Sequence, residues 1–384
     1  MKGNSIRDLL ASIQKKYMSQ RNPLFNCNVE TQKKYISGFK EPTSYVERSF
    51  FQYKCQFKIM YGSLAKILFT IGSLFLIIYI LLKRNIKIET EPVAEAVFIA
   101  DGKSPDIVPL ELKERFTTYK MLDCLQESML TKKDREYIFS IIKKYPFSYF
   151  FLLKVIIKIS EYSAIIHTYH PKTIIVCNEY SFTSSVLTDY CHIYNVNHIN
   201  VMHGEKLYYI RDSFFRYDEC FVWEQHYKDL LISLRADAAQ FKIAIPENLK
   251  FCHKVQKKDN YDFKYYLANE NQGELLQVKR SLDRLKEKNY RIKVRPHPRY
   301  TDLKLMKDIL CEYAFEDNHI TIEESLMETR NAIALCSTVL NQALYNDINI
   351  VIDDVVNPDK FEKLKQLRYL CLDKPHLLLS MIIT

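Results

Sequence analysis

Glycine is scarce in this chain, with seven residues among 384. Neither of the glycine-rich loops typical of P-loop proteins and of dinucleotide-binding domains is present. A phosphate group bound by this protein must therefore be held by helix N-termini, arginine and histidine. The chain also contains no Asp-x-Asp sequence. Carboxylates spaced to chelate a metal ion and its diphosphate are therefore missing, and we expect no metal and no other cofactor.

Paired cysteine spacings are missing as well. None of the ten cysteines forms a Cys-x-x-Cys pair, and several lie inside apolar runs. They indicate buried, reduced thiols in a cytosolic protein rather than a disulfide framework or a zinc site. The formal net charge is +9, and no RNA-binding signature accompanies it. This charge favours anionic substrates or an anionic membrane surface and predicts no nucleic-acid partner.

The length and the 47% hydrophobic composition predict two or three domains with substantial cores. From Val93 onward, apolar strands alternate with amphipathic helices, which is typical of a mostly parallel sheet. We expect two Rossmann-like domains that face a cleft, residues 93–250 and 260–384, joined by a polar, lysine-rich linker. The expected strands are residues 96–100, 173–177, 198–202, 220–223, 241–246, 264–268, 291–295, 319–322, 332–336 and 348–352. The expected helices are residues 132–168, 183–194, 225–234, 274–288 and 303–313.

Residues 1–92 form a helical N-terminal region that ends in a strongly apolar helix, residues 61–82. The first thirty residues are polar and show no signal peptide, and helical pieces are expected at residues 5–17 and 30–35. The apolar run from Ile67 is shorter than the roughly 20 residues that span a bilayer, unless Lys66 snorkels. Two alternatives remain, a buried or interfacial helix and a transmembrane helix. Both bring the chain close to a membrane.

A stiff cationic turn follows the strand at residues 291–295. In Arg295-Pro296-His297-Pro298-Arg299, each proline fixes its own φ and disfavours helix in the residue before it. His297 is therefore held at the carboxyl end of a strand, where ligands bind in open α/β sheets. Arg295 and Arg299 suit phosphate oxygens. The simpler interpretation is a proline-rich surface turn with a solvated histidine.

A second phosphate-suited strand end lies about forty residues further on. An apolar strand runs into Cys336-Ser337-Thr338, and an apolar-periodic helix follows. The hydroxyls of Ser337 and Thr338, with the free N–H groups of the helix start, form an anion site. Simple helix capping is the alternative. Two such strand ends in one domain predict a nucleotide monophosphate or diphosphate site.

Acids and one histidine follow strands in the N-terminal domain. Glu179 and His203 are the candidates for a catalytic base, and Asp101 and Glu205 are candidates for acceptor contact or a second base. Each has a simpler alternative, since such residues also cap helices or form turns. A transfer reaction needs a base here and cationic groups on the leaving phosphate in the other domain.

Three motifs carry a resemblance to a known family. They are His203-Gly204, Arg295 to Pro298, and Ser337-Thr338-x-x-x-Gln342-Ala343, within about residues 95–355. Together they resemble the bacterial GT-B glycosyltransferases of capsule and O-antigen synthesis, especially sialyl- and polysialyltransferases, and also CDP-glycerol glycerophosphotransferases. The resemblance implies that His297 and the hydroxyls hold a cytidine nucleotide phosphate and that His203 is a base. Relatives often carry Glu where this chain has Gln342.

The sequence thus predicts a metal-independent glycosyltransferase that uses a CMP- or CDP-linked donor, such as CMP-sialic acid, and a glycan or glycolipid acceptor. We expect it in the cytoplasm, at the inner face of the cytoplasmic membrane. The alternatives are a CDP-polyol phosphotransferase of the teichoic-acid type and a non-catalytic, membrane-associated assembly protein. A protonated His297 would assist the leaving phosphate, so activity is expected to fall as the pH rises through its pKa.

Overall fold

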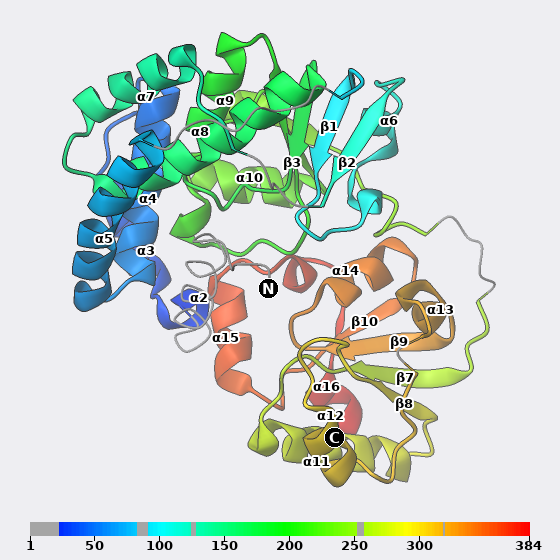
Figure 1. Cartoon of the computed structure of the whole chain (residues 1–384). Coiled ribbons are helices and arrows are strands. Elements are labelled where there is room, and N and C mark those ends of the chain that lie inside the picture. Colours follow the sequence, from blue (N-terminus) through cyan, green and yellow to red (C-terminus); the bar gives the residue numbers. More distant parts are fainter. Residues whose placement is uncertain (1–22, 83–90, 124–127, 252–256, 318) are drawn as a thin grey trace. The chain divides into compact units, whose positions relative to one another are not determined.

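The computed structural model describes residues 23–82, 91–123, 128–251, 257–317 and 319–384 (Figure 1). The helix expected at residues 5–17 lies outside them. The chain divides into two compact units. The first contains residues 1–203 and 208–244, and the second contains residues 204–207 and 245–384. The helices of the N-terminal region therefore group with the first Rossmann-like domain.

The first unit is built on a six-stranded parallel sheet with the strand order β2-β1-β3-β4-β5-β6. Every residue of β1 and β3 is buried, because helices and loops cover both faces of the sheet. The chain forms β2 on one side of β1 and β3 on the other, so a topological switch point lies between β1 and β3. The strands are β1 Ala96–Ile99, β2 Tyr119–Leu122, β3 Thr173–Val176, β4 Asn197–Val201, β5 Glu219–Val222 and β6 Phe241–Ile243.

The helical stretch predicted at residues 132–168 is divided into two helices, α7 and α8. Pro146 causes the break, since a proline disfavours helical φ and ψ in the residue before it, here Tyr145. Tyr145 is the C-cap of α7, with φ −134° and ψ 54°. The helical segments after β1 are η1 Pro105–Ile107, α6 Leu110–Lys113, α7 Lys132–Lys144, α8 Tyr149–Tyr169, α9 Ser184–Ile193, η2 Ile210–Asp212, α10 Gln225–Ser233 and η3 Ala238–Gln240.

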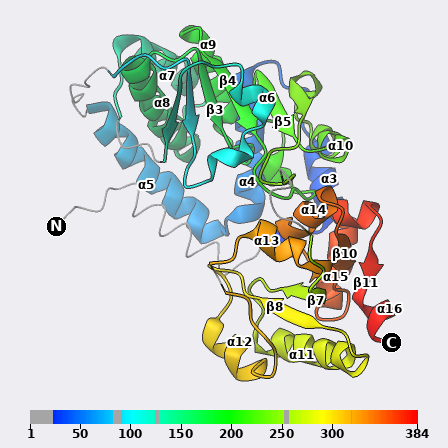
Figure 2. The same ribbon diagram turned by 90° about the vertical axis from the view of Figure 1, so that its right-hand side faces the viewer.

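In the part of the chain that the structure describes, four helices precede the first strand: α2 Pro23–Asn26, α3 Val29–Ser37, α4 Tyr45–Met60 and α5 Ser63–Leu82. Of these, α4 packs against α9 and η2, and α5 runs alongside α8 (Figure 2). Ser49 and Gln52 of α4 are fully buried although they are polar. The hydroxyl of Ser49 accepts a hydrogen bond from the N–H of Val186 at 2.9 Å, which ties α4 to α9.

The second unit has a five-stranded parallel sheet with the order β11-β10-β9-β7-β8. Its switch point lies between β7 and β9, since β8 and β9 pair with opposite edges of β7. The strands are β7 Tyr261–Tyr266, β8 Ile292–Arg295, β9 Thr329–Ala334, β10 Asn349–Ile352 and β11 Leu377–Leu378. The helical segments are α11 Gln272–Glu287, α12 Leu303–Ile309, α13 Ile322–Met327, α14 Thr338–Tyr345, α15 Pro358–Gln366, η4 Leu370–Asp373 and α16 Leu379–Ile383.

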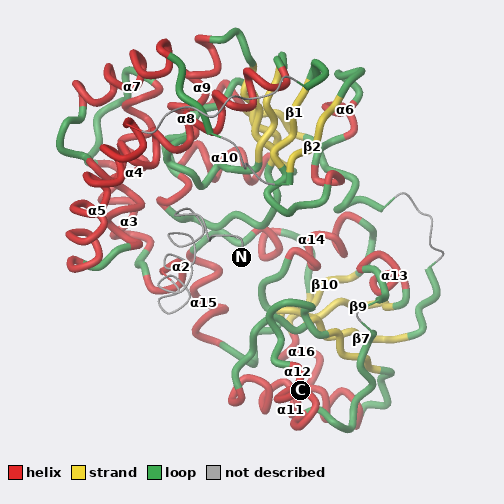
Figure 3. The backbone as a smooth tube through the Cα atoms, viewed as in Figure 1, coloured by secondary structure: helices red, strands yellow, loops and turns green. Residues whose placement is uncertain are grey.

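The strand predicted at residues 319–322 is wrong, because this segment begins helix α13. Thr321 is the N-cap, and its hydroxyl accepts from the N–H of Glu324, whose carboxylate accepts from the N–H of Thr321. The predicted fold class is confirmed. Each unit is a doubly wound α/β layer structure, with helices around a parallel sheet (Figure 3).

Candidate functional site

Glu179 and His203, which the sequence offers as separate candidates for a base, lie next to each other in the first unit. Glu179 follows β3 and His203 follows β4, and these strands are neighbours in the sheet. The Nδ1 atom of His203 is 3.5 Å from the Oε1 atom of Glu179. The side chain of Glu179 is 1% exposed, whereas that of His203 is 24% exposed. In this carboxylate–imidazole dyad, the imidazole is the group that a substrate hydroxyl can reach.

The dyad is held by residues that sequence reasoning missed. The side-chain amide of Asn200 donates to Oε2 of Glu179 at 3.1 Å. The Nε2 of Gln52 donates to the carbonyl oxygens of Glu179 and Arg211, at 3.1 and 3.0 Å. Gln56, one turn later on α4, also donates to the Arg211 carbonyl at 3.0 Å. The signal in the sequence was two glutamines four residues apart on an aromatic-rich helix, which predicts one shared face.

Asp101 lies beyond β1, beside the dyad rather than within it. It adopts a left-handed φ of 51° and is followed by Gly102 at 74°, so the turn uses residue types that tolerate this region. Its side chain is 55% exposed and lies 3.9 Å from the Nζ of Lys103. Asp101 also lines a polar cavity of about 150 Å³ in the first unit. It therefore remains a candidate for acceptor contact.

That cavity lies at the switch point of the first sheet. Asn178 and Tyr180, which flank Glu179 in the chain, both line it. Burial, with the nearby charges of Glu179 and Asp101, raises the pKa of Tyr180, so its hydroxyl stays protonated and can act as a hydrogen-bond donor. Further hydroxyl groups come from Ser181, Thr183, Ser184 and Tyr217. A lining of this kind suits a polyhydroxylated molecule.

Glu205 was a candidate for acceptor contact or a second base, but the structure gives it a different partner. The segment Gly204–Leu207 groups with the second unit. The carboxylate of Glu205 accepts a hydrogen bond from the side-chain amide of Asn341, on α14, at 2.6 Å. The carboxylate of Glu205 therefore lies against α14, and its part in acceptor contact stays a prediction.

In the second unit, Ser337 and Thr338 lie where the sequence predicts them. Ser337 is the N-cap of α14, and its Oγ accepts from the N–H of Val339 at 3.3 Å. Thr338 is the first residue of the helix. Ser337 lines a small cavity, about 40 Å³, at the carboxyl ends of β7, β9 and β10. Burial raises the pKa of Cys336, also in its lining, to about 12, so the thiol stays protonated.

The same cavity contains residues that the sequence analysis did not select. Asn357 caps α15, and its side chain accepts from the N–H of Lys360 at 3.0 Å. Both residues line the cavity, so the N-termini of α14 and α15 border it together with a lysine. Helix N-termini and a lysine are groups suited to an anion, and the acids Glu270, Glu274 and Asp353 also line the cavity. Glu270, on the opposite wall, has its pKa raised by burial.

His297 is fixed in the turn after β8. Its N–H donates to the hydroxyl of Thr301 at 2.8 Å, and that hydroxyl donates to the carbonyl of Ala268 at 2.9 Å. Ala268 lines the small cavity, so Thr301 ties the turn to its wall. The Nδ1 atom of His297 accepts from the N–H of Arg299 at 3.1 Å. Because Nδ1 accepts, the neutral imidazole carries its proton on Nε2.

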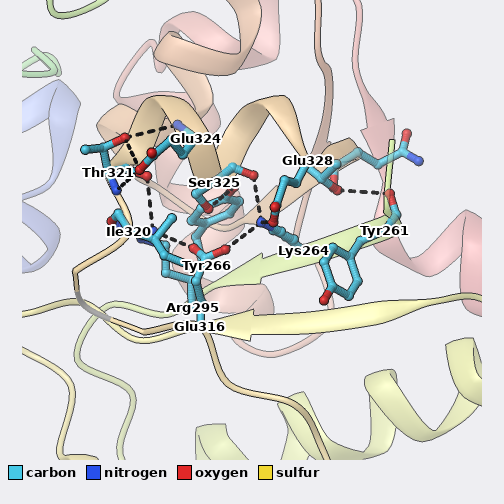
Figure 4. A network of polar contacts seen from close by, with 12 residues as sticks. Tyr261, Lys264, Tyr266, Arg295, Glu316, Ile320, Thr321, Glu324, Ser325 and Glu328 are labelled. Carbon is cyan, nitrogen blue, oxygen red and sulfur yellow. Dashed lines mark hydrogen bonds and ion pairs between the residues drawn. The ribbon is translucent and has the colours of Figure 1, made fainter. Parts of the chain in front are cut away.

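Arg295 was predicted as a phosphate ligand, but its guanidinium is already engaged within the unit. It pairs with Glu316 and donates to the carbonyl of Ile320 at 2.8 Å, and it is 13% exposed. Glu316 also pairs with the fully buried Lys264 of β7 (Figure 4). Arg295 therefore stabilises the fold beneath the turn. Arg299 is exposed and remains a candidate phosphate ligand.

Among the described residues, no group of three or more His, Cys, Asp or Glu side chains is placed to hold a metal ion. The lysine and the two helix N-termini around the small cavity are groups that neutralise phosphate charge without a metal. Metal independence stays a prediction.

No protein-family model matches the sequence, and no curated protein matches it significantly. Solved structures share the arrangement at low identity. The apo lipopolysaccharide outer core galactosyltransferase WaaB is 10% identical, with 76% of this chain and 94% of that chain covered and a TM-score of 0.41. A putative UDP-N-acetylglucosamine 2-epimerase from Listeria monocytogenes is 9% identical (72% and 82% covered, TM-score 0.43). A variant of the wall teichoic acid polymerase TagF is 11% identical (84% and 89% covered, TM-score 0.42). These likenesses carry no argument about activity.

Proposed function

We propose that this chain is a glycosyltransferase that moves a sugar from a nucleotide donor to a hydroxyl group of a surface polysaccharide or glycolipid. The observation that carries the proposal is the dyad of Glu179 and His203 at a strand end of the first unit. A buried carboxylate beside a partly exposed imidazole is an arrangement that prepares a general base. The acceptor hydroxyl loses its proton to Nε2 of His203, while Glu179 orients the ring and stabilises the imidazolium that forms.

The second unit supplies the groups that bind the donor. The leaving phosphate takes its hydrogen bonds from the N-termini of α14 and α15, from Ser337 and Lys360, and from Nε2–H of His297. A cytidine nucleotide is the proposed leaving group, with CMP-sialic acid or a similar sugar donor. The resemblance of the His297 turn and of Ser337-Thr338 to sialyltransferase motifs supports this choice.

A second candidate is a phosphotransferase that uses CDP-glycerol or CDP-ribitol. It rests on His203 as well, because His203 and not Glu179 is the group open to substrate. In this reaction the acceptor hydroxyl attacks phosphorus and CMP leaves. The same base serves both reactions, so the linkage in the product separates them.

The experiment is a transfer assay with CMP-sialic acid, CDP-glycerol and UDP-N-acetylglucosamine, each with a panel of glycan and glycolipid acceptors. We expect nucleotide release from one donor and a new glycosidic linkage in the product by mass spectrometry. A new phosphodiester would establish the second candidate instead. No release from any donor, with an intact fold, would favour the non-catalytic assembly protein.

Turnover in that assay is expected to continue in excess EDTA. Lys360 and two helix N-termini offset the phosphate charge and His297 donates a hydrogen bond, so stripping divalent ions should change the rate by less than about twofold. The rate is measured with EDTA alone and again with added magnesium or manganese. Complete loss in EDTA that either metal restores would show that an ion does the work assigned here to these side chains.

Nucleotide affinity is expected to stay level between about pH 7 and pH 9. Burial, and then the charge of Arg299, lower the pKa of His297, so the imidazole is already neutral there and keeps its Nε2–H donor. This expectation concerns the ligand-free protein, and a fall in activity as the pH rises through the pKa of His297 in the substrate complex stays a prediction. Protonation of Nδ1 removes the acceptor of the Arg299 N–H, so affinity should be lost as the pH falls through the lowered pKa. Calorimetric titration of nucleotide at each pH checks this. An affinity that declines steadily from pH 7 to 9 would show instead that a protonated His297 binds the nucleotide.

A further inference from the structure

Helix α5 exposes a broad apolar face on the surface of the first unit. Its window Ala65–Leu82 has a mean hydropathy of 2.3, and 11% of that window is buried. Phe75 is 68% exposed and Leu82 is 77% exposed. Further large apolar side chains that are at least half exposed are Ile67, Leu68, Ile71, Ile78 and Tyr79. A contiguous exposed surface of this kind marks an interaction site.

The opposite face of α5 is attached to the domain along most of its length. Ser73 and Ile77 are buried, at 2% and 7% exposure. Near the start, the ring of Phe69 lies 5.4 Å from the ring of Phe150, the second residue of α8. Near the end, the guanidinium of Arg135, on α7, donates to the carbonyl of Leu81 at 2.8 Å. The helix therefore lies flat against α8, with one hydrogen bond to α7 near its end.

The stretch of sequence that contains α5 carries charges of a single sign. From Arg48 to Ile88 the sequence contains no Asp or Glu but has seven Lys or Arg residues. Two of these, Lys54 and Lys58 on α4, are exposed. Exposed apolar side chains in a segment that carries only cationic charges are complementary to a bilayer with anionic headgroups.

We propose that α5 lies in the plane of an anionic phospholipid surface and docks the first unit there without crossing the bilayer. A crossing helix would have to carry its packed neighbour α8 into the hydrocarbon. That helix contributes Lys154, Lys158 and Glu161. Charged side chains at that depth are costly. An in-plane helix instead buries only its exposed face, by roughly 5–10 Å. The proposal does not depend on the proposed transferase activity.

The first test is flotation of the full-length protein with vesicles of phosphatidylcholine alone or with added phosphatidylglycerol. The double variant Ile71→Ser/Phe75→Ser should bind anionic vesicles at least about tenfold more weakly, since each substitution removes an apolar side chain from the interface. The matched control is Leu110→Ser/Met381→Ser. These residues are 51% and 71% exposed but lie elsewhere, and we expect their substitution to have no effect.

Charge is tested separately with Lys54→Gln/Lys58→Gln. We expect each lost lysine to weaken binding to anionic vesicles about fivefold and binding to neutral vesicles hardly at all. All substituted side chains are exposed, so circular dichroism should show unchanged folding. Equal binding by wild type and Ile71→Ser/Phe75→Ser would overturn the proposal. So would a dimer in vesicle-free solution that this variant dissociates, because a second copy would then cover the face.

Depth measurements separate docking from crossing. Tryptophan is introduced as Ile67→Trp, Phe75→Trp or Leu82→Trp, and quenching by lipids brominated at different depths is measured. The native Trp223 is 2% exposed and supplies a constant background. Equal, shallow depths at the three positions are expected. A Phe75→Trp probe about 10 Å deeper than the other two would show a spanning helix, because seven or eight residues rise by that distance.

Discussion

Replacing His203 with alanine is expected to slow transfer by about 10²- to 10⁴-fold, the usual contribution of a positioned general base. The imidazole is 24% exposed, so the substitution removes little packing, and the unfolding temperature should hardly change. The rate is measured with the donor that the transfer assay identifies. The control is His170→Asn, an exposed histidine with a left-handed φ of 46° that asparagine tolerates. An unchanged rate in His203→Ala would remove His203 from the mechanism.

The partner substitution Glu179→Gln tests the dyad itself. Its carboxylate faces two groups, the Nδ1 of His203 at 3.5 Å and the amide of Asn200 at 3.1 Å. A glutamine has one side-chain oxygen, so it can accept from only one of them and must turn its NH₂ toward the other. We expect a large drop in kcat with little change in KM. If Glu179→Ala and Glu179→Gln each changed kcat and KM unfavourably by similar factors, Glu179 would have a structural role instead.

Replacing Lys264 with methionine is expected to destabilise the second unit by about 3–5 kcal/mol. Lys264 is fully buried, and its Nζ donates to Glu316, to the carbonyl of Ser325 at 2.8 Å and to Glu328 at 3.1 Å. Without it, two carboxylates lose a buried cation. The control is Lys363→Met, on the exposed face of α15, for which we expect less than about 0.5 kcal/mol.

Two probes make that measurement specific to one unit. The single tryptophan, Trp223, follows β5 in the first unit, so its fluorescence reports that unit. Hydrogen exchange in β7 and β9 reports the second. Lys264→Met should accelerate exchange in these strands and leave the tryptophan transition in place. Unchanged protection there would contradict the role given to Lys264.

The network around Lys264 also predicts a dependence on pH. Burial alone would raise the pKa of Glu316, but hydrogen bonds from Lys264, Ser325 and Arg295 outweigh it and lower the pKa. Glu316 therefore contributes stability above the ordinary pKa of a glutamic acid, and this stability is lost as the pH falls through the lowered value. In Lys264→Met the loss should begin at a higher pH.

The buried strands of both sheets could be predicted because continuous apolar runs of four or five residues have few alternatives. The edge strand β2 was missed because its residues are half-buried or exposed and show no alternation. Residues 319–322 were predicted as a strand. The capping box of Thr321 and Glu324 instead begins a helix there, and the strand prediction did not take it into account.

The site could be predicted only as separate groups. Glu179 and His203 each stood out at a strand end, but the order of strands that brings them to 3.5 Å is a property of the sheet. Arg295 looked like a ligand because nothing near it in sequence pairs with it. Its partner Glu316 is brought next to it by an isolated β-bridge between Val294 and Phe315. No local sequence pattern indicates this pairing. Long-range pairing therefore limits what the sequence can say about a charged residue.

The proposed transferase activity requires that the second unit bind a cytidine nucleotide. The full-length chain is titrated calorimetrically with CMP, CDP, UDP and GDP, alongside His297→Ala and the control His319→Ala, whose native side chain is 97% exposed. We expect saturable binding of a cytidine nucleotide to wild type and to His319→Ala, and binding at least about tenfold weaker to His297→Ala. If none of the four nucleotides binds at millimolar concentration, or if His297→Ala binds like wild type, the second unit is not the donor site that this account requires.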